Sequence, residues 1–215
     1  YPHLKVYDAA TDSERLEPYS QRMAALMCAN DYENGYWFSP SNQEIKGIVG
    51  VERPITGGYS EPDSEANALN ENGITTVINA FGAGIRSWGN RTAAWPSETH
   101  PINFIAVRRV ADVVEESLTM ASARYVDKPG GQAQIDDVVA SGNAFMRDLI
   151  QRGAILDGRV WFDAQKNSAA QMALGNYVYC YDIMPPTPQE RITFLAHINQ
   201  NYLTELAERI AGSAS

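Results

Sequence analysis

Three histidines are the residues of this 215-residue chain best suited to acid–base chemistry near neutral pH, where an imidazole titrates. They are His3, His100 and His197. A serine or cysteine hydrolase needs such a base beside its nucleophile, and an acid to orient the base. None of the three stands in a recognisable catalytic signature, and the GxSxG elbow is absent. We therefore predict no catalytic residue and no enzymatic activity.

Carboxylates and thiols do not form a metal-binding pattern either. Glu115 and Glu116 are adjacent, so they point about 100° apart on a helix. We expect them on a solvated face rather than as a catalytic pair. Cys28 and Cys180 are isolated from each other in the sequence. A disulfide between them is one alternative, and two buried free thiols are the interpretation we favour. No metal and no cofactor are predicted.

A short glycine-rich stretch, Gly82-Ala83-Gly84, raises the question of a phosphate-binding loop. Such loops carry a third glycine at a set spacing and open a helix. This stretch lacks that glycine and precedes a predicted strand, and no Walker A lysine follows it. We expect it to be the turn of a β-hairpin.

The composition is typical of a folded domain, with 44% hydrophobic and 20% charged residues. The formal net charge is -9, which argues against binding to nucleic acid or to an anionic membrane surface. No apolar run approaches the ~20 residues of a membrane span. We predict no nucleic-acid partner and no membrane insertion. Because Tyr1 opens directly into a predicted strand, we expect a longer protein whose N-terminal part is missing here.

Hydrophobic periodicity predicts both helices and strands. The expected helices lie at residues 18–30, 63–69, 107–121 and 135–150. The expected strands lie at residues 4–7, 74–78, 85–89, 102–105, 158–163, 177–181 and 192–199. Residues 201–210 fit either a terminal helix or an extended arm. We therefore expect an α/β or α+β fold with a mixed β-sheet, flanking helices and two lobes divided near Gly130.

Four stretches together resemble the tail sheath proteins of contractile-tailed phages, especially the P2-like branch, and the sheaths of phage-tail-like bacteriocins. In order, they are residues 36–42 with 47–54, 84–92, 102–109 with 115–117, and 185–194. The resemblance covers residues 1–206 and corresponds to the C-terminal part of a sheath protein. It implies a partial sheath core domain at 1–130 and a C-terminal sheath domain with a terminal strand or arm at 131–215.

The resembling stretches contain a group of residues that we expect to preserve a shape and not a reaction: Trp88, Asn90, Arg91, Thr92, Arg108 and Arg109. Independently of the family, Arg91 places a planar cation with several donors at a strand end. Such a side chain is well suited to pin neighbouring loops.

The resemblance implies a structural subunit that polymerises in helical rings around an inner tail tube and contracts to drive the tube through the host envelope. The implied partners are other copies of the chain, the tail tube protein, and baseplate and tail terminator proteins. Assembly in the host cytoplasm and a final place in the virion tail, or in a phage-tail-like particle, are implied as well.

Two sets of residues are candidates for these contacts. Sheath subunits are linked by terminal arms that add strands to neighbouring sheets, and our candidates for such a strand are Ile192, Phe194, Ala196 and Ile198. The resemblance also implies that a helix of the C-terminal domain faces the tube by charge complementarity, and our candidates there are Arg147 and Arg152.

Three alternatives stay open at this point. The particle can be of the R-type-bacteriocin kind instead of a phage. A small α/β hydrolase or nucleotide-utilising enzyme would require a Ser, a His and an Asp that converge on one cleft. A monomeric binding module would show no ordered self-association.

Overall fold

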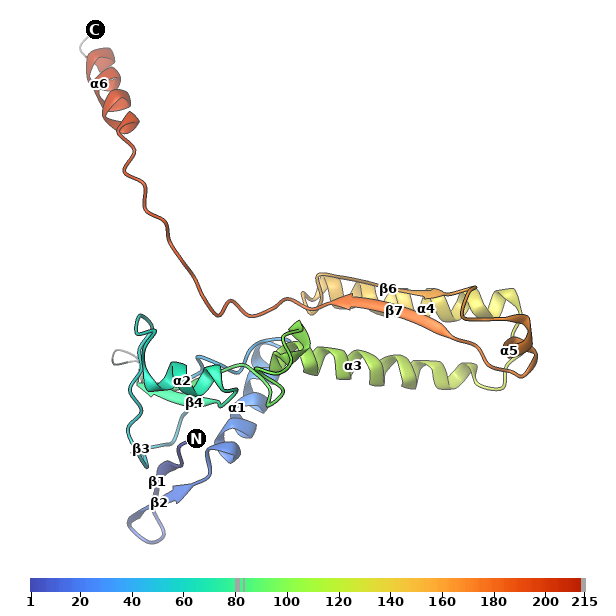
Figure 1. Cartoon of the computed structure of the whole chain (residues 1–215), viewed down its shortest axis with the longest axis horizontal. Coiled ribbons are helices and arrows are strands. Elements are labelled where there is room, and N and C mark those ends of the chain that lie inside the picture. The colour runs from blue at the N-terminus through green and yellow to red at the C-terminus, as the bar shows by residue number, and fades with distance from the viewer. Residues whose placement is uncertain (80–81, 83, 214–215) are drawn as a thin grey trace.

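The computed structural model describes residues 1–79, 82 and 84–213. Figure 1 shows a lobe of short elements that contains the N-terminus, an elongated lobe built on two long helices, and a C-terminal segment that projects away from both. Helices and small antiparallel sheets are mixed along the chain, which confirms the α+β fold class.

The N-terminal lobe begins with a three-stranded antiparallel sheet in the order β2-β1-β3. Its strands are β1 (Leu4–Asp8), β2 (Ser13–Glu17) and β3 (Gly50–Val51). Apolar and polar residues alternate along β1, so its apolar side chains face one side and are buried. They pack with the helix α1 (Tyr19–Glu33) around a core formed by Leu4, Tyr19, Ile45 and Val77.

A hairpin of β4 (Thr76–Asn79) and β5 (Ile85–Trp88) completes this lobe and confirms the predicted strand pair. The helix α2 (Glu65–Glu71) packs on β4. The side chain of Ser64 caps α2 by accepting a hydrogen bond from the Asn67 amide. Ala83, in the expected hairpin turn, lies outside the described residues.

The elongated lobe consists of the antiparallel helices α3 (Ile105–Ser122) and α4 (Gln132–Gln151) and a hairpin of β6 (Asp157–Phe162) and β7 (Tyr179–Met184). The short helix α5 (Ala169–Ala173) lies in the connection between the two strands. Both predicted long helices are confirmed. Their apolar stripes contribute to one core, which contains Val110, Val114, Met146, Leu149, Ala154, Ile155 and Val160.

The two lobes are joined through side chains at the end of α1. Tyr36 and Trp37 pack against the core of the elongated lobe. The guanidinium of Arg109 on α3 donates two hydrogen bonds to the carboxylate of Asp31 on α1. The core of the elongated lobe includes residues on both sides of Gly130, and a domain division into residues 1–130 and 131–215 stays a prediction.

Two details of the predicted sheet are wrong. The described strands form three separate antiparallel sheets instead of one mixed sheet. Within each of them the strands pair antiparallel, and among the described residues no helical crossover brings two parallel strands together. The strand β2 was not anticipated because its residues are mostly exposed and polar, without an apolar alternation to signal them.

Two predicted strands are absent. Residues 101–103 form a short 3₁₀ helix, η1 (Pro101–Asn103), and α3 starts at Ile105. Pro101 favours the first helical position, and the ring of His100 accepts a hydrogen bond from the Ile102 amide, so the chain turns here. Residues 192–199 are extended but have no strand partner in the described part of the chain. After them comes the helix α6 (Asn201–Ser213). Of the two alternatives for residues 201–210, the terminal helix is therefore the one observed.

Both cysteines are free, as favoured, but their expected burial is wrong for Cys28, which is exposed on α1. Among the described residues, no helix combines the length and the apolar character that a bilayer crossing requires.

Candidate assembly surface

The C-terminal segment, defined as residues 191–213, exposes apolar side chains to an unusual degree. Phe194 is 91% exposed and Ile198 is 98% exposed. Ile192, Phe194, Ala196 and Ile198 recur at every second position, so in an extended chain they share one face. Contiguous exposed apolar surface of this kind marks an interaction site. Figure 1 shows the segment leading away from both lobes.

The helix α6 ends this segment and is amphipathic. Tyr202, Leu203, Leu206 and Ile210 lie on one face, at helical spacing, and all four are exposed. An isolated helix of 13 residues is marginal in water, because nucleation is costly and the apolar side chains of this one stay largely exposed. The segment therefore has the character of a part that becomes covered in an assembly.

The hairpin of β6 and β7 offers a surface of complementary kind. It is a two-stranded sheet in which α4 packs along β6. Each strand of a two-stranded sheet has one edge without a strand partner, and a free edge presents unpaired backbone donors and acceptors to an incoming strand. The register runs from Asp157 opposite Met184 to Phe162 opposite Tyr179, so six residues of edge are available on each strand.

The root of the C-terminal segment is held by Arg91. Its Nε donates to Oε1 of Glu190 at 2.8 Å, and a second guanidinium nitrogen donates to the other carboxylate oxygen. A third nitrogen donates to Oδ1 of Asn103. The guanidinium carbon lies 4.3 Å from the ring centre of Trp95 and 3.7 Å from that of Phe104. Charge pairing, hydrogen bonding and stacking thus all act on one side chain.

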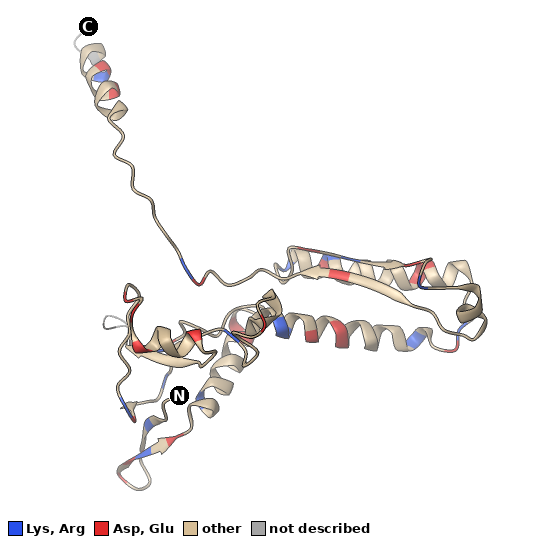
Figure 2. Cartoon of the chain, in the orientation of Figure 1, with Lys and Arg blue, Asp and Glu red and all other residues tan. Residues whose placement is uncertain are grey.

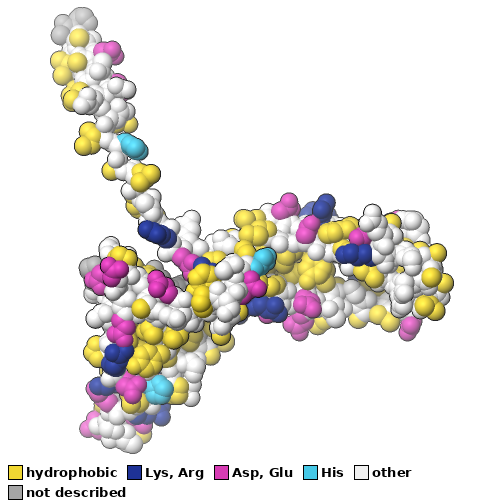
Figure 3. Space-filling model, viewed as in Figure 1, with side chains coloured by type: hydrophobic (Ala, Val, Ile, Leu, Met, Phe, Trp, Pro, Cys, Tyr) yellow, Lys and Arg dark blue, Asp and Glu magenta, His cyan; other side chains and the backbone are white. Residues whose placement is uncertain are grey.

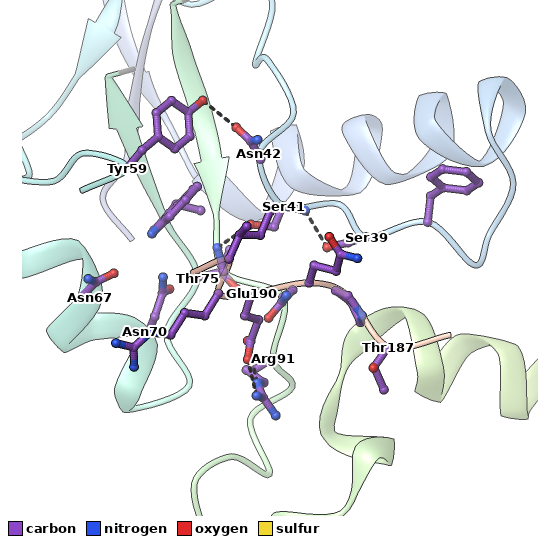
Figure 4. A pocket seen from close by; sticks show the side chains of 18 of the residues that line it. Ser39, Ser41, Asn42, Tyr59, Asn67, Asn70, Thr75, Arg91, Thr187 and Glu190 are labelled. Atoms are coloured by element: carbon purple, nitrogen blue, oxygen red, sulfur yellow. Dashed lines mark hydrogen bonds and ion pairs between the residues drawn. The ribbon is translucent and has the colours of Figure 1, made fainter. Parts of the chain in front are cut away.

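This cluster borders an open groove of about 1570 Å³ between the N-terminal lobe and residues 186–194. Figure 4 shows its polar lining, with Asn42, Asn67 and Asn70 on one side and the Arg91–Glu190 pair on the other. The residues that line it include serines and carboxylates but no histidine or cysteine. A hydrolase triad or dyad therefore has no base or thiol in this groove.

The histidines do not converge elsewhere. The His100 ring caps η1, and His197 lies in the extended C-terminal segment. Figure 3 shows the histidine side chains of the visible face in well-separated places. The described residues also contain no group of three or more His, Cys, Asp or Glu side chains placed to hold a metal ion.

Three of the six predicted motif residues are consecutive in the sequence, and the structure places them beside the start of α3. Asn90, Arg91 and Thr92 lie beside residues 103–105, through backbone hydrogen bonds from Thr92 to Asn103 and from Ile105 to Asn90. Trp88 instead packs against the core of the hairpin and stands edge-on to Tyr59.

The two arginines on α3 serve different contacts. Arg108 pairs with Asp112 one turn later, on the exposed face of the helix. Arg109 crosses to Asp31, and this hydrogen bond raises the pKa of the Arg109 guanidinium above its ordinary value. Of the two, only Arg109 joins the lobes.

The two candidate tube-facing arginines do not form one patch. Arg147 is exposed on α4, whereas Arg152 is the C-cap residue of α4. Five positions on a helix correspond to a rotation of about 140°. Arg152 also lies near Asp148, at 3.4 Å, and over the ring of Trp37. Their role stays a prediction.

Sequence reasoning missed the acidic partners Glu190 and Asp31. Glu190 is 99 positions from Arg91, and Asp31 is 78 positions from Arg109. No local pattern links residues at such distances. The only available signal was the motif arginine itself, which predicted that some neighbouring loop would be pinned.

Two models of phage tail sheath domains match the chain. The phage tail sheath protein central domain matches residues 1–93, and the phage tail sheath C-terminal domain matches residues 97–199.

Curated relatives carry the same description. The tail sheath protein of Burkholderia phage BcepMu is 48% identical over 206 residues, which are 96% of this chain and 43% of that protein. The tail sheath protein of Escherichia phage P2 is 30% identical over 98% of this chain and 52% of that protein. The chain spans about half the length of the curated relatives it matches.

Solved structures share the fold. The sheath complex of an extracellular contractile injection system, PVC, in the contracted state matches 94% of this chain and 56% of its own chain, with a TM-score of 0.80 and 21% identity. A chain of the anti-feeding prophage baseplate matches 93% of this chain and 54% of its own, with a TM-score of 0.78 and 22% identity.

Proposed function

The chain belongs to the phage tail sheath family, and on that premise we propose that it is part of a contractile sheath subunit that polymerises around an inner tail tube. The observation that carries this proposal is the projecting C-terminal segment, whose apolar side chains are exposed in the single chain. An exposed apolar segment of this kind marks a surface that a partner covers. Contraction of the polymer then drives the tube through the host envelope.

The link between copies is made by strand addition. In it, Ile192, Phe194, Ala196 and Ile198 of one copy lie along a free edge of the β6–β7 hairpin of the next. Backbone hydrogen bonds supply the affinity, and the alternate apolar side chains supply the fit. Because the donated segment and the edge that accepts it are different surfaces, the contact is head-to-tail when successive copies are linked. Such a contact generates an open helical polymer where the rotation between copies does not close into a ring.

The remaining partners follow from the same proposal. The tail tube protein contacts the C-terminal part of α4 at two separate points, Arg147 and Arg152, and the two ends of the polymer meet baseplate and tail terminator proteins. Subunits assemble in the host cytoplasm and end in the tail of a phage or of a phage-tail-like particle. The work is done by a rearrangement of rigid subunits, without catalysis.

The proposal predicts that charge on the donated strand prevents polymerisation. We expect the complete gene product to form hollow, helically ordered tubes in electron micrographs, alone or with its tube protein. Phe194→Asp together with Ile198→Asp should abolish these tubes, because two carboxylates would be buried at the new interface without partners. The variant should stay folded, since both side chains are exposed in the single chain.

A matched control adds the same charge nearby. Thr204→Asp together with Asn201→Asp places two carboxylates on the polar side of α6 and should leave the tubes intact. If the wild-type gene product never forms ordered polymers, with or without a tube protein, the sheath proposal fails.

A further inference from the structure

The C-terminal segment is tied to the body of the molecule at one point. Within the described residues, no backbone hydrogen bond connects residues 185–199 to the rest of the chain. The side-chain tie over this stretch is the pair between Glu190 and Arg91. Every described residue after Glu190 is exposed through Gly212, so the described body of the molecule buries no residue of the segment beyond that point.

The chain before Glu190 is held by other means. Pro185 is buried, and Pro186 and Pro188 are partly buried along the groove. The ring of each proline fixes φ, which leaves this stretch with few alternative conformations. In Figure 4 the segment with Thr187 and Glu190 crosses the groove, with Ser39 and Ser41 of the N-terminal lobe on its far side.

The receiving side of the tie is rigid. The Arg91 side chain is only 16% exposed, stacked between Trp95 and Phe104 and bonded to Asn103, which is itself fully buried. Asn103 donates in turn to the carbonyl oxygen of Glu98 at 2.9 Å. A guanidinium held in this way loses little freedom when it binds a carboxylate with two parallel hydrogen bonds.

We propose that Arg91 and Glu190 form a clamp that fixes the point where the C-terminal segment leaves the body, so that the link between copies bends after Glu190 and not at the prolines before it. The inference rests on the proposed function, because the position of the exit matters only if the segment joins copies. With the clamp closed, only residues 191–200 adapt between α6 and the body, and ten extended residues span at most about 35 Å.

The clamp predicts a specific change in proteolysis. Trypsin cleaves after Arg191, the residue next to the clamp, and a protease needs several freed residues on both sides of the bond. Glu190→Gln removes the charge but keeps the shape, and should speed cleavage after Arg191 by about tenfold, the factor that corresponds to about 1.4 kcal/mol. Arg91→Lys, which keeps the charge but loses the paired geometry, should give an intermediate rate.

Two controls separate the clamp from a general loosening. Cleavage after Arg209, in α6, should not change in either variant, because that site lies beyond the clamp. Glu208→Gln, an equal change of charge in the same segment, should leave the rate at Arg191 unaltered. Equal cleavage rates at Arg191 in the wild type and in Glu190→Gln would overturn the proposal.

A second experiment tests the consequence for assembly. In the complete gene product, Glu190→Gln should give shorter or irregular tubes, while Glu208→Gln gives wild-type tubes. Wild-type order in the Glu190→Gln tubes would contradict the clamp while leaving the sheath proposal intact. Absence of tubes in the wild type would instead count against the sheath proposal itself, so the two failures are distinguishable.

Discussion

At the scale of single residues, Tyr19 shows how a polar group is accommodated in the N-terminal core. Its ring packs with Leu4 and Val77, and its hydroxyl donates to the carbonyl oxygen of Thr76 at 3.1 Å. Tyr19→Phe keeps the ring and removes the hydrogen bond. We expect a loss of about 1 kcal/mol in the free energy of unfolding at pH 7. Chemical denaturation measures it, with the exposed Tyr32→Phe as a neutral control.

The same residue predicts a pH dependence. Burial raises the pKa of Tyr19 above its ordinary value, which is about 10. The neutral phenol is thus favoured in the folded state, so its contribution is complete below about pH 10 and is lost as the pH rises through the folded-state pKa. Between pH 9 and pH 11 the free energy of unfolding should fall by more in the wild type than in Tyr19→Phe. Parallel losses in both proteins would exclude Tyr19 as the cause.

At the scale of elements, the amphipathic helices α3 and α4 were predictable because their periodicity extends over several turns. The strand expected at 102–105 failed for a local reason, since Pro101 and the capping His100 start a turn there. The strand expected at 192–199 failed for a non-local one. A strand needs a neighbour, and the chain has none for it in its described part.

The extended form of the C-terminal segment was predictable to a similar degree, while its part in assembly stays a prediction. The alternation of Ile192, Phe194, Ala196 and Ile198 marks an extended segment with one apolar face, and the structure places them in such a segment. The several donors of Arg91 led us to expect that it holds a neighbouring loop in place, but the sequence did not identify that loop. The partner, Glu190, comes from folding together two parts of the chain that no sequence pattern connects.

The contact between α4 and β6 depends on a residue without a side chain. A Cβ atom on Gly142 would lie 2.8 Å from a methyl group of Val160, closer than real contacts allow. Gly142→Ala should therefore destabilise the elongated lobe by about 1–3 kcal/mol, although alanine is the better helix former. The double variant Gly142→Ala with Val160→Ala should lose less free energy of unfolding than the sum of the losses of the two single variants.

Denaturant midpoints of the single and double variants test this packing argument. Gly131→Ala is the control for the close approach, because its new methyl group would meet no atom within 4 Å. Its expected cost is that of alanine at the N-cap position of α4, about 0.5–1 kcal/mol. If Gly142→Ala were as stable as the control, the close approach of α4 and β6 would not limit this position.

At the scale of the whole molecule, positive and negative residues are both spread over the surface despite the negative net charge. The net charge is -9, yet Figure 2 shows basic and acidic residues on both lobes. A tube-facing surface would therefore be identified by the positions of its charged residues and not by the net charge of the chain. Arg147 is an exposed cation for which the described part of the chain provides no ion pair, whereas Arg152 already has Asp148 and Trp37 as neighbours.

These differences make the proposed tube contact testable. Arg147→Glu with Arg152→Glu should abolish binding of the complete gene product to purified tail tube protein, because like charges would then face acidic groups. Arg108→Glu with Arg124→Glu changes the net charge equally at two other exposed cations and should leave tube binding intact. Arg147→Glu alone should weaken binding without touching the Trp37 contact between the lobes. Sedimentation with preformed tubes measures all three. Undiminished binding of the Arg147 and Arg152 double variant would exclude this side of α4 and direct the search to the other exposed charges of the elongated lobe.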